Sequence, residues 1–341
     1  MKKWLSVLAC IGFASSVLAA GNVELEADHP SNYIVQKGDT LWDISDKFLK
    51  SPWKWPKLWQ ANQQIANPHL IYPGDILSLV YINGEPKIIL NRGTGATVKL
   101  SPSIRTTALT SAIPAIPLDK IDVFLNRGRF VEQGELEGKP YVVAGGKRHL
   151  VTGAGDQIFA RGAFDKGSDS YGIYREEELF IDPETNEVLG LQLRSIGLAQ
   201  IVAQDSDITT LSVNRSAEEI RIGDNLLSSE IRSVSAVYQP SAPDVDVDGV
   251  IIGVDKGVSQ VGKMSVVVIN LGERDQIQEG DVMAIMKTGE VVRDNTAKDL
   301  VQLPDQRAGL LMVFRVFDKL SYGLVLQANQ GLSVDDKVAM P

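Results

Sequence analysis

The sequence predicts an α+β protein, in which a small strand-helix-helix-strand module is followed by mostly-β modules, small barrels or sandwiches, in series. Two observations carry this prediction. Between residues 33 and 80, alternating apolar runs stand on both sides of a segment with helical periodicity. After residue 85 helix signals become scarce, and strands rich in Val, Ile and Tyr recur between Gly, Asp and Asn turns.

The length and charge of the chain limit its class. With 341 residues it can hold two or three domains, and 44% hydrophobic residues is the composition of a globular protein. The formal charge is −9, and no basic stripe interrupts the acidic sequence. Nucleic acid and anionic lipid are therefore not expected as main partners.

Residues 1–19 have the pattern of a signal peptide. Lys2 and Lys3 precede a short apolar stretch that ends at the small-residue pattern 17–19. We expect export to the periplasm or cell envelope, with no membrane span after cleavage, because the apolar stretch is too short. Cleavage would also remove Cys10, the single cysteine. Lipid attachment at Cys10 is the alternative, but it would leave an apolar region of only six residues.

Residues 20–31 are polar and predict a flexible lead-in, and a strand follows at 33–35. Thr40 and Asp43 have the spacing of a capping box, which predicts a helix start. Ser51 before Pro52 predicts a second start with a hydroxyl cap.

One face of the second predicted helix is apolar. Trp55, Leu58 and Trp59 recur at helical spacing, so the two tryptophans are expected in the core. A Pro-Gly turn at 72–75 then leads into a strand at 76–80. We place this module at residues 32–81.

Residues 33–44 together with residues 72–77 resemble the LysM (lysin motif) domain, chiefly through the Gly-Asp-Thr-Leu run at 38–41 and the Tyr-Pro-Gly strand entry. The resemblance covers about one seventh of the chain. It implies a βααβ fold that binds glycans containing N-acetylglucosamine, in bacteria the peptidoglycan strand. Asp75 stands where the family usually has Gln, and Leu79-Val80 replaces the usual Ile-Pro, both at the back of the module.

The resemblance also implies a glycan site, a shallow groove between two loops whose backbone amides and carbonyls read the N-acetyl group. The loops consist of Gly38, Asp39, Thr40 and Leu41, and of Asn67, Pro68, His69, Leu70, Ile71 and Tyr72. Among the tryptophans, Trp53 lies off the apolar helix face, so we expect it to be the exposed candidate for stacking on a sugar ring.

The rest of the chain is divided into a β-rich connecting domain at 82–150 and repeated β modules at 151–341. A tight Asn83-Gly84 turn joins two strands at the start. The predicted repeat rests on Gly-Asp turns that each open a short apolar strand, separated by 68, 57 and 55 residues. These turns are Gly155-Asp156, Gly223-Asp224, Gly280-Asp281 and the degenerate Asp335-Asp336.

The sequence carries no recognisable catalytic pattern. The three histidines, His29, His69 and His149, form no zinc motif, and no Gly-x-Ser-x-Gly elbow accompanies them. We therefore expect no enzyme and no cofactor. The alternative is a peptidoglycan-remodelling enzyme with an unrecognised carboxylate pair in residues 85–341.

One acidic run has the spacing of a calcium loop. Asp244, Asp246 and Asp248 alternate before a glycine, and Asp255 stands at position 12. Its flanks are not helical, so we expect an acidic turn that enters a strand, with calcium binding as the alternative. The expected function is non-catalytic binding of peptidoglycan by residues 32–81, with the β modules as a scaffold or docking surface for another envelope protein. Binding of a protein or a small ion in place of glycan is the remaining alternative.

Overall fold

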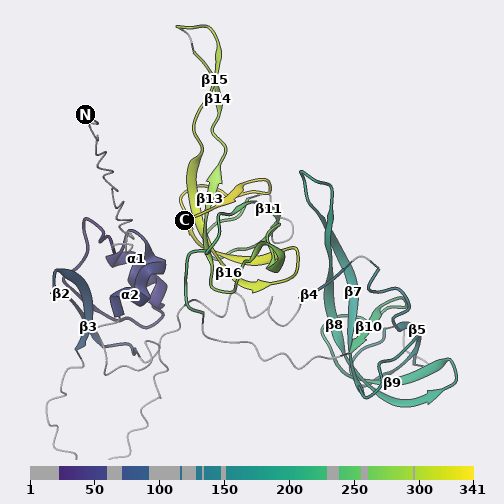
Figure 1. Cartoon of the computed structure of the whole chain (residues 1–341). Coiled ribbons are helices and arrows are strands. Elements are labelled where there is room, and N and C mark those ends of the chain that lie inside the picture. The colour runs from purple at the N-terminus through teal and green to yellow at the C-terminus, as the bar shows by residue number, and fades with distance from the viewer. Residues whose placement is uncertain are drawn as a thin grey trace, which may run out of the picture.

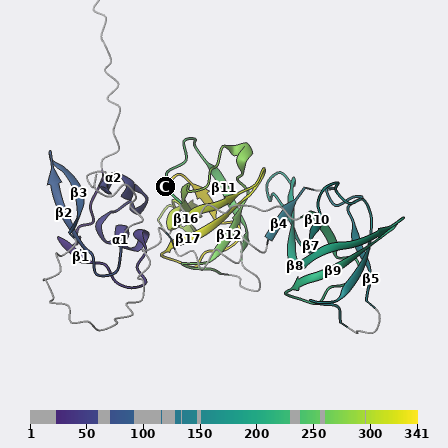
Figure 2. The same cartoon turned by 90° about the horizontal axis from the view of Figure 1, so that it is seen from below.

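The computed structural model describes residues 23–59, 71–91, 116, 128–132, 134–146, 151–228, 238–254, 260–294 and 296–341. These residues form three units (Figure 1): an N-terminal α+β module, a first barrel within residues 128–228 and a second barrel within residues 238–341. The second barrel lies between the other two units in both Figure 1 and Figure 2. The predicted fold class, a small βααβ module followed by mostly-β units, is confirmed.

The N-terminal module has a three-stranded antiparallel sheet in the order β1-β2-β3. β3 lies beyond the boundary placed at residue 81, and its Ile88 and Leu90 are buried in the module's core. Asn83 and Gly84 join β2 to β3 with positive φ angles of 54° and 84°, as a tight hairpin turn requires. The elements are β1 (Asn32–Ile34), α1 (Leu41–Phe48), the 3₁₀ turn η1 (Pro52–Lys54), α2 (Trp55–Trp59), β2 (Ile76–Ile82) and β3 (Glu85–Asn91).

The first helix starts where the sequence predicts. Thr40 Oγ1 accepts a hydrogen bond from the Asp43 N–H at 3.1 Å, and its own hydroxyl donates to Asp43 Oδ2 at 2.7 Å. In a full capping box the acidic side chain accepts from the backbone N–H of the cap residue. Here the Asp43 carboxylate accepts from the Thr40 hydroxyl. The cap expected from Ser51 is wrong: its side chain makes no capping hydrogen bond, and the chain enters a 3₁₀ turn at Pro52.

Part of the predicted lead-in packs on this module. The Glu26 N–H donates to the Phe48 carbonyl at 2.9 Å, and the Lys50 N–H donates to the Glu24 carbonyl at 3.1 Å. Leu25 packs against the module's core, which contains Trp55 and Leu58. Residues 24–26 therefore pair with the residues at the C-terminal end of α1.

In the first barrel β8 pairs with both β7 and β9, which closes the ring β5-β6-β9-β8-β7-β10. β4 pairs with the other end of β8. The boundary placed at residue 150 falls inside this unit. Its strands are β4 (Gly128–Val131), β5 (Tyr141–Gly145), β6 (Gln157–Arg161), β7 (Ser170–Ile181), β8 (Val188–Asp205), β9 (Ile208–Ser216) and β10 (Asn225–Ser228).

The second barrel is closed as β11-β12-β17-β16-β13-β18. β14 and β15 form a separate two-stranded hairpin that projects from it (Figure 1). The strands are β11 (Asp248–Val254), β12 (Val266–Ile269), β13 (Val282–Lys287), β14 (Val291–Arg293), β15 (Leu300–Gln302), β16 (Gln306–Val316), β17 (Ser321–Ala328) and β18 (Lys337–Ala339).

The two barrels have the same topology. With six strands numbered along each chain segment, both rings follow the order first, second, fifth, fourth, third, sixth. The two barrels also share corresponding hydrogen bonds between their first strand and the turn before their sixth. The Val142 N–H donates to the Asp224 carbonyl at 2.9 Å in the first barrel, and the Ile251 N–H donates to the Asp336 carbonyl at 2.9 Å in the second. Residues 128–228 and 238–341 are thus two versions of one architecture.

A single turn type precedes many of the strands and also helix α1. In each, an aspartate side chain accepts a hydrogen bond of 2.8–3.0 Å from the N–H three residues earlier, next to a residue with positive φ. The aspartates are Asp39, Asp75, Asp156, Asp224, Asp281 and Asp336. This turn also occurs in the N-terminal module and at least twice in each barrel. The intervals between Gly-Asp turns therefore do not give the length of the repeated unit, which is a whole six-stranded barrel.

Candidate functional site

The first loop of the implied site is held in place by its own carboxylate. Gly38 has φ +98°, a conformation that other residues rarely adopt, and no atom lies within 4 Å of where its Cβ would be. Asp39 Oδ2 accepts hydrogen bonds from the Gln36 N–H and from the Tyr33 hydroxyl, both at 2.8 Å. Burial and this hydrogen bond raise the pKa of Tyr33 to about 12. The space beside Gly38 is therefore open, while Asp39 fixes the turn.

Thr40 and Leu41 serve the fold with their side chains. The Thr40 hydroxyl is buried in the cap of α1, and the Leu41 side chain is fully buried in the module's core. Only backbone groups of these two residues remain to contact a ligand.

The second loop is described only in its last part. Ile71 is fully buried in the core, and Tyr72 is half-buried, with its N–H donating to Asp75 Oδ2 at 3.0 Å. The other implied site residues, Asn67, Pro68, His69 and Leu70, lie outside the described residues.

Backbone hydrogen bonds bring the two loops together. The Val35 N–H donates to the Asp75 carbonyl at 2.9 Å, and the Gly74 N–H donates to the Val35 carbonyl at 2.8 Å. The turn that contains Gly38 therefore begins directly beside the turn that follows Tyr72. The described parts of the implied groove lie together.

The prediction that Trp53 is exposed is wrong. Trp53 is only 5% exposed, because it packs in one hydrophobic cluster with Trp42 and residues of the second barrel. The guanidinium carbon of Arg307, on β16, lies 5.5 Å from the centre of the Trp53 ring. The core positions expected for Trp55 and Trp59 are confirmed.

A residue that sequence reasoning missed lies next to the first loop. Lys263, in the turn before β12, forms an ion pair with Asp43 Oδ1 at 3.1 Å. The same Asp43 contacts Thr40, the cap of α1, through its other oxygen. No local pattern could find this contact, because 220 residues separate the partners in sequence.

Candidate chemistry elsewhere is limited. Among the residues that the structure describes, no three His, Cys, Asp or Glu side chains lie together as a metal site. Asp248 opens strand β11, as expected, whereas Asp255 and His149 lie outside the described residues. No helix in the described part of the chain is long and apolar enough to cross a membrane.

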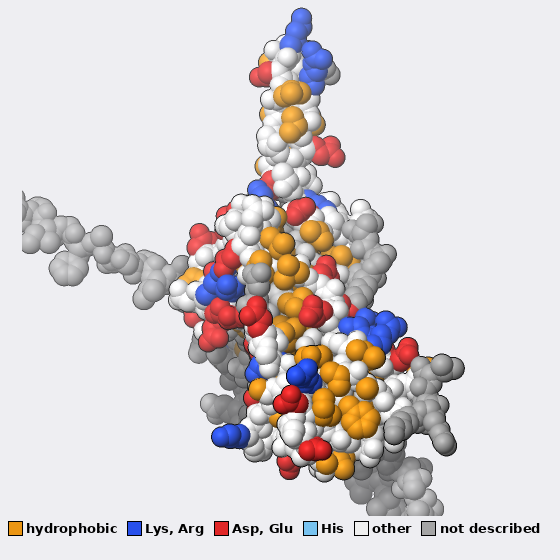
Figure 3. All heavy atoms as spheres, turned by 90° about the vertical axis from the view of Figure 1, so that its right-hand side faces the viewer, with side chains coloured by type: hydrophobic (Ala, Val, Ile, Leu, Met, Phe, Trp, Pro, Cys, Tyr) orange, Lys and Arg blue, Asp and Glu red, His pale blue; other side chains and the backbone are white. Residues whose placement is uncertain are grey.

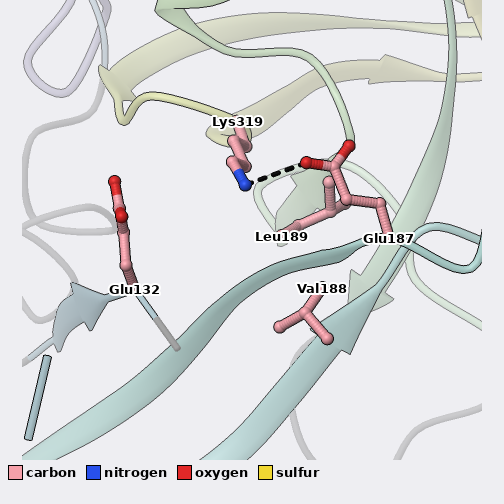
Figure 4. Close-up of a pocket in the computed structure, with 5 residues that line it drawn as sticks. All are labelled: Glu132, Glu187, Val188, Leu189 and Lys319. Carbon is pink, nitrogen blue, oxygen red and sulfur yellow. Dashed lines mark ion pairs between the residues drawn. The ribbon is translucent and has the colours of Figure 1, made fainter. Parts of the chain in front are cut away.

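A pocket between the two barrels contains two carboxylates (Figure 4). It has a volume of about 260 Å³ and is lined by Glu132, Glu187, Val188, Leu189 and Lys319. Glu187 forms ion pairs of 2.8 Å with both Lys319 and Arg274, and these hydrogen bonds lower its pKa. A carboxylate held ionised by two cations is poorly suited to donate a proton as a general acid.

Comparison with known proteins identifies the N-terminal module. Residues 33–80 match the family described as "LysM domain". A segment of 60 residues is 40% identical to "Uncharacterized protein YqbP" of Bacillus subtilis (strain 168). That segment is 15% of this chain and 27% of the relative, so this chain spans about a quarter of that protein's length.

Proposed function

Because residues 33–80 are a LysM domain, a fold that supports binding of peptidoglycan- or chitin-type glycans, we propose that this chain binds peptidoglycan without cutting it. In the proposal the glycan lies between the Gly38 turn and the Tyr72 turn. The observation that supports it is the backbone pairing of these turns through Val35, which brings the described ends of the two implied loops together.

Two turns beside the proposed groove are held by their own side chains. Asp39 and Asp75 each accept a hydrogen bond within their turn, so these two turns have little backbone order to gain on binding. The open space beside Gly38 lets a sugar approach the backbone. In this arrangement backbone groups read the N-acetyl amide, and Tyr72 supplies an aromatic edge.

The two barrels serve as the part that the LysM domain attaches to the wall. Trp53 and Trp42 are buried against the second barrel, so the LysM domain packs directly on that barrel. Export follows from the pattern in residues 1–19, and the envelope is where LysM domains typically occur. The ion pairs of Glu187 favour a non-catalytic role, since they hold one of the two carboxylates in the pocket between the barrels.

Titration with N-acetylglucosamine oligomers tests the glycan half of this proposal. By calorimetry the full chain should bind, and Tyr72→Ala should weaken binding by about tenfold, or about 1.4 kcal/mol. Tyr81→Ala is the matched control, because Tyr81 is exposed on the distal end of β2. Absence of binding by the full chain, or equal affinity of a folded Tyr72→Ala variant, would contradict the site.

A further inference from the structure

Each barrel carries a projecting hairpin, and the two hairpins are equivalent. We call residues 179–191, at the end of β7 and β8, arm 1, and residues 291–294 and 296–303, on β14 and β15, arm 2. Each arm ends in the same turn, 112 residues apart. Asp182 Oδ1 accepts from the N–H groups of residues 184 and 185, and Asp294 Oδ1 accepts from those of residues 296 and 297. Asn186 and Lys298 then adopt φ angles of 59° and 62°.

Arm 1 is bound to the second barrel by apolar contacts. Its Phe180 and Leu189 are 3% and 4% exposed and belong to the same cluster as Phe314 and Leu320 of that barrel. The Phe180 ring lies over Gly253, where a Cβ would come within 2.5 Å of the ring. The surface of the second barrel is thus shaped for this arm.

Polar contacts fix the tip of arm 1. Asp182 Oδ2 accepts a hydrogen bond from Asn270 Nδ2 at 2.7 Å. Glu187 forms its two ion pairs with Arg274 and Lys319 at the same end of the second barrel. The interface therefore has an apolar centre, and at the tip of arm 1 acidic side chains are bound by polar and basic side chains of the second barrel.

Arm 2 has the same kinds of residues, but they face solvent. Val292 and Val301 occupy the positions of Phe180 and Leu189, pair across the hairpin and are 37% and 41% exposed. Asp294 and Asp299 repeat the acidic tip at the positions of Asp182 and Glu187. In Figure 3 the hairpin projects from the body of the molecule with hydrophobic side chains on its surface. A lone two-stranded hairpin with exposed apolar side chains gains stability from a partner.

The first barrel has its own version of the surface that receives arm 1. Val202 and Ile208 stand 112 residues before Phe314 and Leu320, and they are 58% and 37% exposed. Arg161 pairs with Ile208 across β6 and β9 and offers a cation to an acidic tip. Its present ion pair with Asp207, at 3.3 Å, is exposed and therefore weak enough to exchange.

Arm 2 and this surface do not meet within one chain. In Figure 1 arm 2 extends away from both neighbouring units, whereas arm 1 lies beside the second barrel. We propose that arm 2 binds the first barrel of a second copy of this chain, as arm 1 binds the second barrel within the chain. The two surfaces differ, so the contact is head-to-tail and builds a ring or an open string of copies.

Sedimentation velocity over a range of concentrations tests the association. The average mass of the full chain should rise toward that of dimers and larger species as concentration increases. Val292→Glu with Val301→Glu should keep the chain monomeric at tenfold higher concentration. Leu179→Glu is the matched control, since Leu179 is an exposed apolar residue of arm 1, and it should associate like the unchanged chain. A monomer at all concentrations, or equal loss in the control, would overturn the proposal.

Disulfide trapping then tests which surfaces meet. In a Cys10→Ser background, Val301→Cys and Ile208→Cys chains are oxidised separately and as a mixture. The proposal requires a cross-linked dimer in the mixture and little in either chain alone. Efficient cross-linking of the Val301→Cys chain with itself would show that arms pair with arms, and no enrichment in the mixture would exclude Ile208 as the acceptor. Either result overturns the head-to-tail contact.

Discussion

Trp53 holds the LysM domain against the second barrel, and Trp53→Ala should loosen this contact selectively. The side chain is 5% exposed and shares a hydrophobic cluster with residues of the second barrel such as Phe314. Because Trp53 lies in η1, outside the core that holds Trp55, its removal leaves most of the LysM core intact. The substitution therefore separates packing between units from folding within them.

The expected cost follows from the contacts. Truncating a buried tryptophan to alanine costs about 3–5 kcal/mol. The Arg307 guanidinium over the ring adds about 0.5–1 kcal/mol. The Lys263–Asp43 pair is half-exposed, so Lys263→Ala should cost less than about 1 kcal/mol. Trp53→Ala should thus weaken the interface several times more than Lys263→Ala.

Two optical signals distinguish the units. Apart from Trp4, all tryptophans lie in the LysM domain, so their fluorescence reports its unfolding, while circular dichroism is dominated by the barrels. In denaturant, Trp53→Ala should move the fluorescence midpoint well below the dichroism midpoint. Tyr81→Ala should leave both unchanged. A shift in Trp53→Ala no larger than that of Lys263→Ala would refute the burial of Trp53 as the main contact.

Three further outcomes are expected. Tyr33 should titrate near pH 12, measured by its ultraviolet absorbance, and Asp39→Asn should lower that value. Because folding raises the pKa of Tyr33 above 10.0, the protonated Tyr33 hydroxyl stabilises the folded protein below pH 10, and this stabilisation is lost as the pH rises toward 12. Burial alone would raise the pKa of Asp182, but its hydrogen bonds with Asn270 and the turn lower it below its ordinary value. The hydrogen-bonded ion pairs of Glu187 with Lys319 and Arg274 lower its pKa as well. The attachment of arm 1 should thus be strongest above pH 4.5 and weaken as acid protonates these groups, which proteolysis of the arm can follow. Gly253→Ala should destabilise the same attachment by about 1–3 kcal/mol in denaturant unfolding, since its Cβ meets the Phe180 ring.

Local rules predicted the LysM domain well because its signals are short-range. The Thr40 cap, the helix face of Trp55 and Trp59, and the Asn83-Gly84 turn each depend on residues a few positions apart. The exposure predicted for Trp53 is wrong because Arg307 and other residues of a distant unit cover its side chain. A side chain off the local apolar face can be buried by a neighbour that no window of sequence contains.

The barrels show a second limit of sequence reasoning. The sequence shows the Gly-Asp turns, but the turn is a local feature that precedes strands throughout the chain, as before Ile76, and even a helix, as at Asp39. The larger repeat is defined by strand order and by contacts such as Val142 with Asp224, which pair residues far apart in sequence. The two arms share few identical residues beyond Asp182 and Asp294, so their equivalence lies in the turn geometry and in the strand order.

Co-sedimentation of the full chain with insoluble peptidoglycan, with soluble sugar fragments assayed in the same supernatant, tests the central claim most directly. Retention on peptidoglycan that falls in Tyr72→Ala but not in Tyr81→Ala, with no fragments released, is the expected result. Equal pelleting of all three proteins would contradict the LysM groove as the binding site. Release of fragments by the unchanged chain would contradict its non-catalytic role.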